Sequence, residues 1–372
     1  MQSTFPLTPR RVVVKLGTGI LTSQTAGIDT ARIAEICRQI NELRRRGTDV
    51  IVVSSGAVGL GMARLGLKQR PRKLERLQAC AAIGQSILIQ LWQQGFEPFD
   101  THVAQLLVTR DDLRSRARHI AAMNTFNHLL SEGVVPVVNE NDSVSAEEIK
   151  FGDNDVLSAM VASLTGADFL FILSTAPGLM NLNEGGTVIP VVEKITPEIE
   201  RLAGGTSSAT AVGGMVTKIA AARIANRSGC GVFIASGAEP DIVPRLLSGE
   251  GPGTFFVPSG LPMEAKKRWL AFFEKPRGTL LVDEGARRAL CDSGSSLLAI
   301  GIKDVQGDFK PGDIVNIADG EHRIFARGVA RYADDEVRAI LGKKAAELQA
   351  LHPRRKRLEV VHRDALVMML VS

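Results

Sequence analysis

The sequence contains little cysteine and no pattern that would put cysteine to use. Its four cysteines stand far apart among 372 residues and form no CxxC pair; they are Cys37, Cys80, Cys230 and Cys291. Closely spaced cysteines are typical of zinc sites and disulfide frameworks. The sequence therefore predicts neither, and we expect the four cysteines to be core or helix residues.

Long apolar runs are missing as well. Residues Met1–Pro9 lack the apolar stretch of a signal peptide. No segment approaches the roughly 20 apolar residues that a membrane-spanning helix needs. We expect a soluble, cytoplasmic protein with no membrane partner.

An excess of one charge is missing too. The formal net charge is +5. The part from Pro276 onward contains 16 basic and 14 acidic residues, and the part before Pro276 contains 29 basic and 26 acidic residues. RNA-binding surfaces usually combine a basic excess with aromatic side chains. Because neither part is strongly basic and Tyr332 is the lone tyrosine, RNA binding is poorly supported.

The chain does contain enough apolar material for a large core, since 45% of its residues are hydrophobic. Its length exceeds that of one ordinary domain, so we expect two. Up to about Pro258, β-branched runs alternate with helical stretches, which indicates an α/β domain with a mostly parallel sheet. The expected strands are Arg11–Leu16, Val50–Val53, Val103–Leu107, Val134–Val138, Phe169–Leu173 and Val232–Ala235, and the expected helices include Leu74–Gln94 and Ile219–Arg227.

The first helix is expected over Asp29–Arg46. Its apolar residues recur every three or four positions and so fall on one face, and Asp29 is placed to cap its start. That face consists of Ile33, Ile36, Ile40 and Leu43.

The texture changes near Pro276. Met263–Glu274 resembles an amphipathic connector, and Pro276 with Gly278 interrupts it. Short strands separated by glycine turns then predict a small β-rich domain, so we expect domains over residues 1–260 and 276–360. The expected elements are strands Thr279–Val282, Leu297–Ala299, Ile314–Ile317 and Ile324–Val329, a helix over Lys343–Leu351, and a solvated charge run over Pro353–Arg357.

Lys15 is the first candidate for chemistry. It lies in an apolar strand directly before Gly17-Thr18-Gly19. Glycines let the backbone approach a phosphate, and a lysine beside such N–H groups supplies a point charge. A strand-end lysine that reaches into solvent is an equally weighted alternative.

Two further glycine-bearing turns follow the same logic. Ser54–Gly61 follows the second strand, and Val212–Lys218 opens a helix with glycines first and a lysine in its early turns. Helix N-termini bind anions, although such turns also serve tight packing. The Walker spacing GxxxxGK[ST] and the dinucleotide fingerprint GxGxxG are both absent.

Carboxylates and amides are dense in two nearby loops. Asn139–Asp142 follows the strand Val134–Val138, and Gly152–Asp155 comes shortly afterwards. Such groups bind an ammonium, orient lysines or hold a hydrated magnesium ion. A pair of Asx turns is the alternative.

Taken together, these motifs resemble the glutamate 5-kinases of the amino acid kinase family over nearly the whole chain. They read, in order, VVKLGTG, VVSSGAVGLG, VVPVVNENDSVSAEEIKFGDNDVLSA and GGMVTKIAAA, with AIGQ and LW between them, and VDEGA and GSSLL in the second domain. The resemblance implies a three-layer α/β/α sandwich followed by a PUA domain. It also implies transfer of the γ-phosphoryl group of ATP to glutamate, with Mg²⁺, as the first step of proline biosynthesis.

The resemblance also implies roles for single residues. Lys15 and Lys218 would bind the ATP phosphates and stabilise the transferring group, and Asp155 would organise both lysines. Glutamate would be held by Ser55, Asp142 and Asn154. The nucleotide site would be lined by Ser174 and Thr175, and by Val212, Gly213, Gly214, Met215, Val216, Thr217 and Lys218.

The chain departs from the family pattern near the nucleotide. Ser174-Thr175-Ala176-Pro177 and Asn183-Glu184 stand where the family has Thr-Asp and a later Asp-Pro. Gly19 replaces a usual serine, and Val212 a usual threonine. The changes at Gly19 and Val212 remove no charge from the expected phosphoryl-transfer centre, so we expect retained activity with an altered nucleotide affinity.

The reaction that the resemblance implies needs no general base. The side-chain carboxylate of glutamate, with a pKa near 4.3, is already ionised at neutral pH. This agrees with the absence of histidine from every motif, so His102, His119 and His128 are interpreted as structural or exposed. The family further implies a homo-oligomer, often a tetramer, and delivery of the reactive product to glutamyl-phosphate reductase.

Two alternatives stay open. Another amino acid kinase, acting on a different carboxylate or on carbamate, would use the same lysines and glycine loops. A regulatory or RNA-binding protein built on a decayed kinase would explain the PUA resemblance and the altered Ser174-Thr175 loop.

Overall fold

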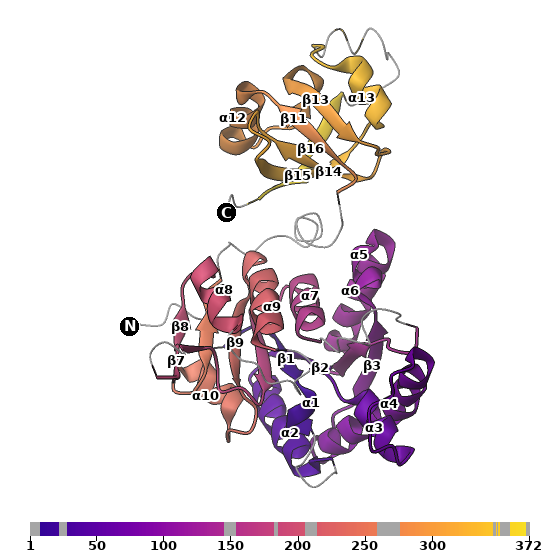
Figure 1. The fold of residues 1–372 in the computed structure, drawn as a ribbon, viewed down its shortest axis with the longest axis vertical. Helices are drawn as coiled ribbons and strands as arrows, with labels where there is room; N and C mark the ends of the chain where they lie inside the picture. Colours follow the sequence, from indigo (N-terminus) through magenta and orange to yellow (C-terminus); the bar gives the residue numbers. More distant parts are fainter. Residues whose placement is uncertain are drawn as a thin grey trace. The chain divides into compact units, whose positions relative to one another are not determined.

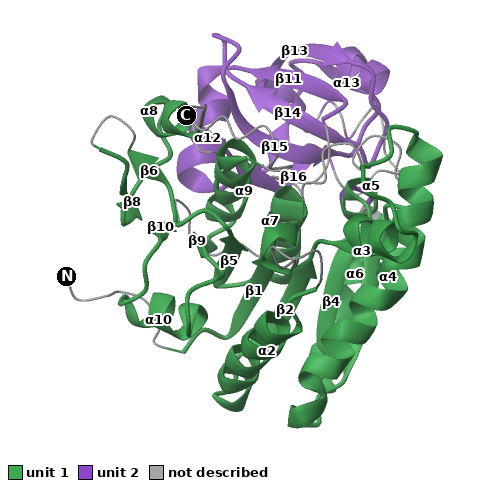
Figure 2. Ribbon diagram, turned by 60° about the horizontal axis from the view of Figure 1, so that its bottom comes forward, with its two compact units in different colours: residues 1–113, 117–263 green, residues 114–116, 264–372 purple. Residues whose placement is uncertain are grey.

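The computed structural model describes residues 8–21, 28–144, 154–181, 185–204, 214–258, 276–344, 347, 349 and 358–369 (Figure 1). Contacts divide the chain into two compact units, residues 1–113 with 117–263 and residues 264–372 with 114–116 (Figure 2). Each unit has its own sheet and its own core.

The first unit is built on a sheet of eight strands in the order β3-β4-β2-β1-β5-β9-β10-β8. Its neighbours pair in parallel, except that β10 runs antiparallel to β9. The strands are β1 (Arg11–Leu16), β2 (Asp49–Ser54), β3 (Val103–Val108), β4 (Val135–Glu140), β5 (Phe169–Ser174), β8 (Val191–Val192), β9 (Gly231–Ser236) and β10 (Thr254–Phe256). A separate pair is formed by β6 (Met180–Asn181) and β7 (Thr187–Val188).

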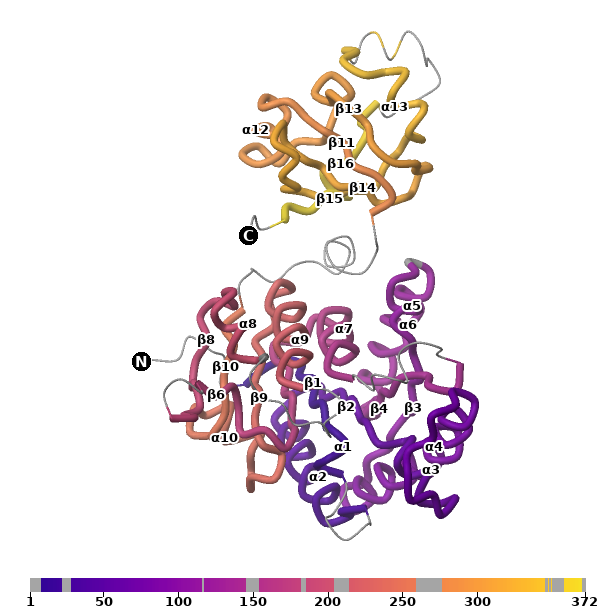
Figure 3. Tube along the Cα trace, in the orientation of Figure 1, coloured from indigo at the N-terminus to yellow at the C-terminus, as the bar shows by residue number. Residues whose placement is uncertain are grey.

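Strands far apart in the sequence lie side by side in this sheet. Strand β1 lies between β2 and β5, and β9 lies beyond β5; the trace in Figure 3 shows β9, β1, β2, β4 and β3 in this order across the sheet. The chain leaves β1 toward β2 and β4 on one side and returns to β5 on the other. Ligands of open α/β sheets bind beyond the carboxyl ends of the strands at such a reversal.

Helices cover both faces of the sheet, so the predicted three-layer α/β/α architecture is confirmed. One layer contains α2 (Thr30–Arg45) and α10 (Ile242–Ser248), and the other contains α7 (Asn154–Thr165) and α9 (Met215–Arg227). The remaining helices of this unit are α1 (Thr18–Leu21), α3 (Ala57–Arg64), α4 (Leu74–Phe96), η1 (Glu97–Phe99), α5 (Arg110–Arg114), α6 (Arg116–Ser131) and α8 (Pro197–Gly204).

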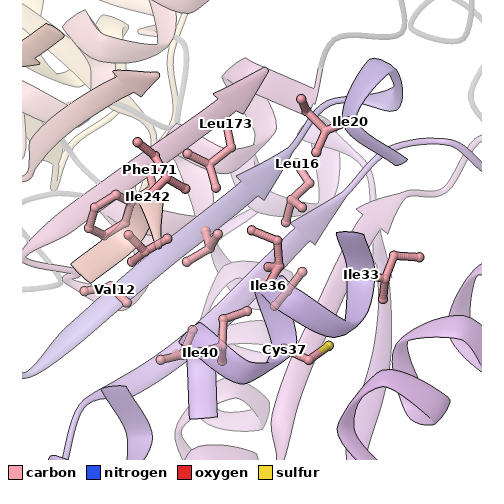
Figure 4. Packing of buried hydrophobic residues seen from close by; sticks show 14 of the residues in the cluster. Val12, Leu16, Ile20, Ile33, Ile36, Cys37, Ile40, Phe171, Leu173 and Ile242 are labelled. Carbon is pink, nitrogen blue, oxygen red and sulfur yellow. The ribbon is translucent and has the colours of Figure 1, made fainter. Parts of the chain in front are cut away.

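The side chains of β1 alternate between the two faces of the sheet. Val12, Val14 and Leu16 belong to the core that also contains the apolar face of α2 (Figure 4). Successive strand residues point to opposite faces, so Lys15 lies on the side of α7 and α9. The apolar sequence of β1 therefore delivers one buried lysine to the opposite layer.

The predicted start of α2 is confirmed. Asp29 is its N-cap, and its carboxylate accepts a hydrogen bond of 2.8 Å from the backbone N–H of Arg32. An N-cap of this kind contributes about 1 kcal/mol. The predicted apolar face is buried and packs on β1 and β2.

Helices α3 and α4 cross at a pair of glycines. A β-carbon on Gly84 would lie 1.7 Å from the carbonyl oxygen of Ala57, and one on Gly61 would lie 1.8 Å from that of Cys80. Only glycine permits so close an approach of two backbones. Because α3 begins directly after Gly56, this contact fixes the turn that ends β2.

The second unit is β-rich, as predicted. Its sheet has the order β12-β16-β15-β14-β11-β13. Its elements are β11 (Gly278–Val282), α12 (Glu284–Ser293), β12 (Leu297–Leu298), η4 (Ala299–Gly301), β13 (Ile302–Gly307), β14 (Ile314–Ala318), β15 (Ile324–Ala330), α13 (Asp334–Ile340) and β16 (Glu359–Met368).

Several sequence predictions fall outside the described residues. They are the connector Met263–Glu274, the charge run Pro353–Arg357 and most of the helix Lys343–Leu351. The four cysteines are as predicted: Cys37, Cys80 and Cys230 are buried, Cys291 lies on α12, and all are free thiols. Among the helices that the structure describes, even the 23-residue α4 is not apolar enough to cross a membrane.

Candidate active site

The motifs of the first unit meet at one edge of its sheet. Strands β4, β2, β1 and β5 are parallel neighbours, so their carboxyl ends lie next to one another. In this order the strands end with Asn139 and Glu140, with Ser54, with Lys15 and Leu16, and with Ser174. In this order along the edge, the strand ends supply an amide and a carboxylate, a hydroxyl group, an ammonium group and a second hydroxyl group.

At the centre of this edge one carboxylate joins two lysines. Asp155 Oδ1 accepts a hydrogen bond from Lys15 Nζ, and its Oδ2 lies 3.0 Å from Lys218 Nζ. Thr217 Oγ1 donates to the same Oδ2 at 3.0 Å. Lys15 comes from β1, Asp155 from the first turn of α7, and Lys218 from the first turn of α9.

These three charged side chains are almost completely buried. Asp155 is 1% exposed, and Lys15 and Lys218 are 5% exposed each. Two ammonium groups and one carboxylate leave one positive charge in excess. Buried charges persist only when they are paired, and the excess here suits a further anion that would enter from solvent.

Opposing effects act on the pKa of Asp155. Burial alone would raise it, but the ammonium groups of Lys15 and Lys218 and their hydrogen bonds outweigh burial and hold the pKa below the ordinary value of 3.8. The carboxylate therefore stays ionised at neutral pH and is not a proton donor there.

This depressed pKa predicts a pH dependence of stability. A carboxylate whose folded-state pKa is lowered adds stability above its unfolded pKa and loses it as the pH falls through the folded value. The difference in unfolding free energy between the wild type and Asp155→Asn should be constant from about pH 5 to pH 8 and should shrink below about pH 4. Urea unfolding at a series of pH values measures this; a difference that shrinks between pH 5 and pH 7 would contradict it.

The residue before Asp155 belongs to a different network. Asn154 Nδ2 lies within hydrogen-bond distance of three acceptors: Ser54 O at 3.0 Å, Ser55 Oγ at 3.1 Å and Asn139 Oδ1 at 2.8 Å. Asn154 is 6% exposed and Ser55 is 8% exposed. The first two residues of α7 therefore connect the ends of β2 and β4 with the lysine pair.

The turn after β2 presents backbone N–H groups at the start of α3. Gly56 caps this helix with φ 111°, a left-handed conformation that favours glycine. The unpaired N–H groups of a first helical turn bind carboxylates and phosphates. The tight-packing alternative is confirmed for Ser54–Gly61, because the same segment makes the glycine crossing with α4. The anion-binding interpretation stays a prediction.

The expected nucleotide side is described in part. Ser174 ends β5, and its Oγ accepts from the N–H of Ala176 at 3.2 Å, while Thr175 is exposed. Gly214 precedes α9, which begins with Met215, Val216, Thr217 and Lys218. Val212, Gly213, Asn183 and Glu184 lie outside the described residues.

Two departures from the family pattern fit each other. A β-carbon on Gly19 would lie 2.9 Å from the methyl carbon of Thr175. A serine at position 19 would require this side chain to move. Because Gly19 has no side chain, the methyl group of Thr175 can lie beside it.

The motif Asn139–Asp142 begins within β4 and continues beyond its end. Asn141 forms a local turn, in which its Oδ1 accepts from Ser143 Oγ at 2.6 Å. Asn139 and Glu140 are buried strand residues, so their prediction as a loop was wrong: β4 pairs with β3 as far as Glu140. Asp142 is half-buried just beyond the strand. Within the described ranges, no group of three or more acidic, histidine or cysteine side chains is arranged to hold a metal.

Sequence reasoning missed the glutamines behind this site. Gln85 of α4 is 9% exposed and accepts from Asn139 Nδ2 at 2.8 Å. A signal was present, because Gln85 falls on the same helical face as Ala81, Leu88 and Trp92, which are all buried. A polar residue at a core position needs a hydrogen-bond partner.

Other side chains take structural roles. His119 is 3% exposed, and its Nδ1 lies 3.0 Å from the carbonyl oxygen of Leu113, whereas His102 and His128 are exposed, as predicted. Tyr332 is 1% exposed in the core of the second unit. It is therefore not available to stack on a nucleic-acid base.

Comparison with protein families gives two matches. Residues 10–236 match the amino acid kinase family, and residues 278–352 match the PUA domain. The first match contains every described residue of the lysine and amide networks.

Curated relatives match nearly the whole chain. The glutamate 5-kinase of Syntrophotalea carbinolica is 45% identical over 362 residues, which are 96% of this chain and 97% of that protein. The glutamate 5-kinase of Moorella thermoacetica is 44% identical over 364 residues, 97% and 96% of the two chains. Among solved structures, carbamate kinase from Giardia lamblia bound to AMP-PNP has a TM-score of 0.48 at 15% identity and covers 68% of this chain and 99% of its own.

Proposed function

Because this chain belongs to the amino acid kinase family, we propose that its Lys15–Asp155–Lys218 centre carries out the reaction of a glutamate 5-kinase. The enzyme transfers the γ-phosphoryl group of ATP to the side-chain carboxylate of L-glutamate. The product is L-glutamyl 5-phosphate, and the reaction is the first step of proline biosynthesis. The observation that supports this site is the buried carboxylate held between two buried lysines.

The chemistry needs charge neutralisation and alignment. An ionised carboxylate must approach an ATP molecule that is itself an anion, and the transferring group spreads its charge over its oxygens. Lys15 and Lys218 offset this repulsion, and Asp155 fixes where their ammonium groups lie. Asp155 takes no proton in the reaction, because its pKa lies below 3.8.

The two substrates bind in different halves of the site. Ser55, Asp142 and Asn154 hold glutamate beside the ends of β2 and β4. Ser174, Thr175 and the segment Val212–Lys218 hold the nucleotide beside β5 and α9. Since Asn154 and Asp155 are adjacent on α7, the reacting carboxylate and the phosphoryl group would meet at this point.

Mg²⁺ enters with ATP, whose phosphate oxygens supply its ligands. Residues 1–260 form the kinase domain and residues 276–360 the PUA domain. The enzyme acts in the cytoplasm as a homo-oligomer and passes its reactive acyl phosphate to glutamyl-phosphate reductase.

The test measures ADP release by the purified protein with ATP and Mg²⁺. L-Glutamate is compared with aspartate, N-acetylglutamate and carbamate, and hydroxylamine is present to trap an acyl phosphate as a hydroxamate. We expect ADP release that depends on glutamate and is matched by hydroxamate. Activity with another acceptor alone would keep the family and refute the substrate.

A further inference from the structure

We propose that Gln85, through a chain of side-chain amides, positions Asn154 to accept a hydrogen bond from the α-ammonium group of the acceptor substrate. Gln85 is a positioning residue, because its polar atoms bind other side chains of the protein. The proposal deepens the function proposed above and rests on it.

Four amides from four elements form the chain. Gln85 Nε2 on α4 donates to Gln105 Oε1 on β3 at 3.1 Å. Asn139 Nδ2 on β4 donates to Gln85 Oε1 at 2.8 Å, and Asn154 Nδ2 on α7 donates to Asn139 Oδ1 at 2.8 Å. We call these four residues the amide relay; all but Gln105 are buried.

Backbone groups fix the direction of the amide relay. The N–H of Glu140 donates to Asn139 Oδ1 at 2.9 Å, and an N–H can only donate. Asn139 must therefore turn its NH₂ group toward Gln85, which has to present its oxygen. The carbonyl of Ser54, which can only accept, likewise holds Asn154 Nδ2 at 3.0 Å.

These hydrogen bonds leave the Oδ1 atom of Asn154, and not its NH₂ group, to face the acceptor substrate. Both N–H bonds of the Asn154 amide point to acceptors of the protein, and within the described part of the chain no donor is recorded at its Oδ1. A carbonyl oxygen accepts from an ammonium group and repels a carboxylate. The amide relay thus favours an acceptor that carries an ammonium group.

Gln85 stabilises this orientation together with the backbone groups, because its Oε1 accepts from Asn139 Nδ2. Methionine at this position keeps the length and volume of the side chain but leaves Asn139 Nδ2 without its acceptor. A buried donor that loses its partner is costly, so the present orientation of the Asn139 amide would be less stable in this variant, with the N–H of Glu140 as its remaining anchor. In the fraction of molecules in which Asn139 turns, Asn154 Nδ2 loses one of its three acceptors, and the Asn154 amide is held less firmly toward the substrate.

The experiment compares kcat/KM for L-glutamate with that for glutarate, which has both carboxylates but no ammonium group. In Gln85→Met the preference for glutamate should fall about tenfold, the worth of one lost hydrogen bond, while KM for ATP stays unchanged. Gln85→Glu should keep the preference, because its carboxylate still accepts from Asn139 and the exposed Gln105 can turn to donate.

The matched control is Gln93→Met on the same helix. Gln93 is half-buried, and it binds the backbone of Thr101 and Val103 instead of another side-chain amide. This variant should keep the wild-type preference. An unchanged preference in Gln85→Met, or an equal fall in Gln93→Met, would overturn the proposal.

Two other results of this experiment have different meanings: a Gln85→Met protein that does not fold, and a wild type that is inactive on glutamate. If Gln85→Met does not fold, Gln105→Met takes its place: it frees the Gln85 amide to turn, and a fall in preference of about threefold is expected, whereas no change would overturn the relay. A wild type that does not phosphorylate glutamate would refute the proposed function itself. A wild type active on glutamate with an unaltered Gln85→Met refutes only the relay.

Discussion

Replacing Lys218 with alanine should lower kcat by about 1,000-fold or more, with a much smaller change in KM for ATP. Lys218 is 5% exposed, and its ammonium group lies 3.0 Å from the Asp155 carboxylate. In such a water-poor site, a fixed positive charge acts strongly on the charge that develops during phosphoryl transfer. Steady-state kinetics with ATP, Mg²⁺ and glutamate measure the effect.

The variant should still fold, so that the loss reports on chemistry. Asp155 keeps its hydrogen bonds to Lys15 and to Thr217 when Lys218 is removed. The matched control is Lys303→Ala, which removes a lysine 3.9 Å from Asp283 in the second unit and should retain wild-type kinetics. A near-normal rate in a folded Lys218→Ala protein would remove Lys218 from the phosphoryl-transfer centre.

Replacing Gly84 with alanine should have the largest effect on stability, a loss of about 3 kcal/mol or more. The new β-carbon would lie 1.7 Å from the carbonyl oxygen of Ala57 and 2.6 Å from the backbone nitrogen of Gly61. Both are backbone atoms, so helices α3 and α4 must separate. Urea unfolding measures the change in free energy.

The control for this variant lies on the neighbouring helix. A β-carbon on Gly59 of α3 would meet no atom within 4 Å. Gly59→Ala should therefore be neutral or stabilise the protein by up to about 1 kcal/mol, through helix propensity. If Gly84→Ala unfolds at the same urea concentration as Gly59→Ala, the close helix crossing is not present in solution.

Much of the first unit could be predicted from hydrophobic patterning and turn residues. The strand Arg11–Leu16 agrees with the observed strand, and the expected helix Leu74–Gln94 agrees with α4 to within two residues. These elements are long or strongly periodic, so local sequence decides them. The predicted Asp29 cap is also a local feature, since it depends on the geometry of one turn.

Elements decided by pairing were harder to predict. The expected strand Val134–Val138 ended too early, because partners on β3 extend β4 into polar Asn139 and Glu140. In the second unit, β13 and the ten-residue β16 were not expected at all. Their polar residues become strand residues through neighbours that are distant in sequence.

In the site, too, some features could be predicted from local sequence motifs and others depend on contacts between residues that are distant in sequence. Motif resemblance drew attention to Lys15, Asp155 and Lys218, and the structure brings these three residues together from β1, α7 and α9. It could not reveal the amide relay, because the hydrogen bond between Gln85 and Asn139 joins residues 54 positions apart. No local pattern specifies such a contact.

The central claim is that the side-chain carboxylate of glutamate attacks the γ-phosphorus of ATP at the Lys15–Asp155–Lys218 centre. The most direct test uses glutamate whose side-chain carboxylate carries a heavy oxygen isotope, with hydroxylamine to cleave the acyl phosphate at carbon. The account predicts inorganic phosphate that contains heavy oxygen, formed by the wild type and reduced in Lys218→Ala in proportion to kcat. Phosphate without the heavy isotope would contradict it.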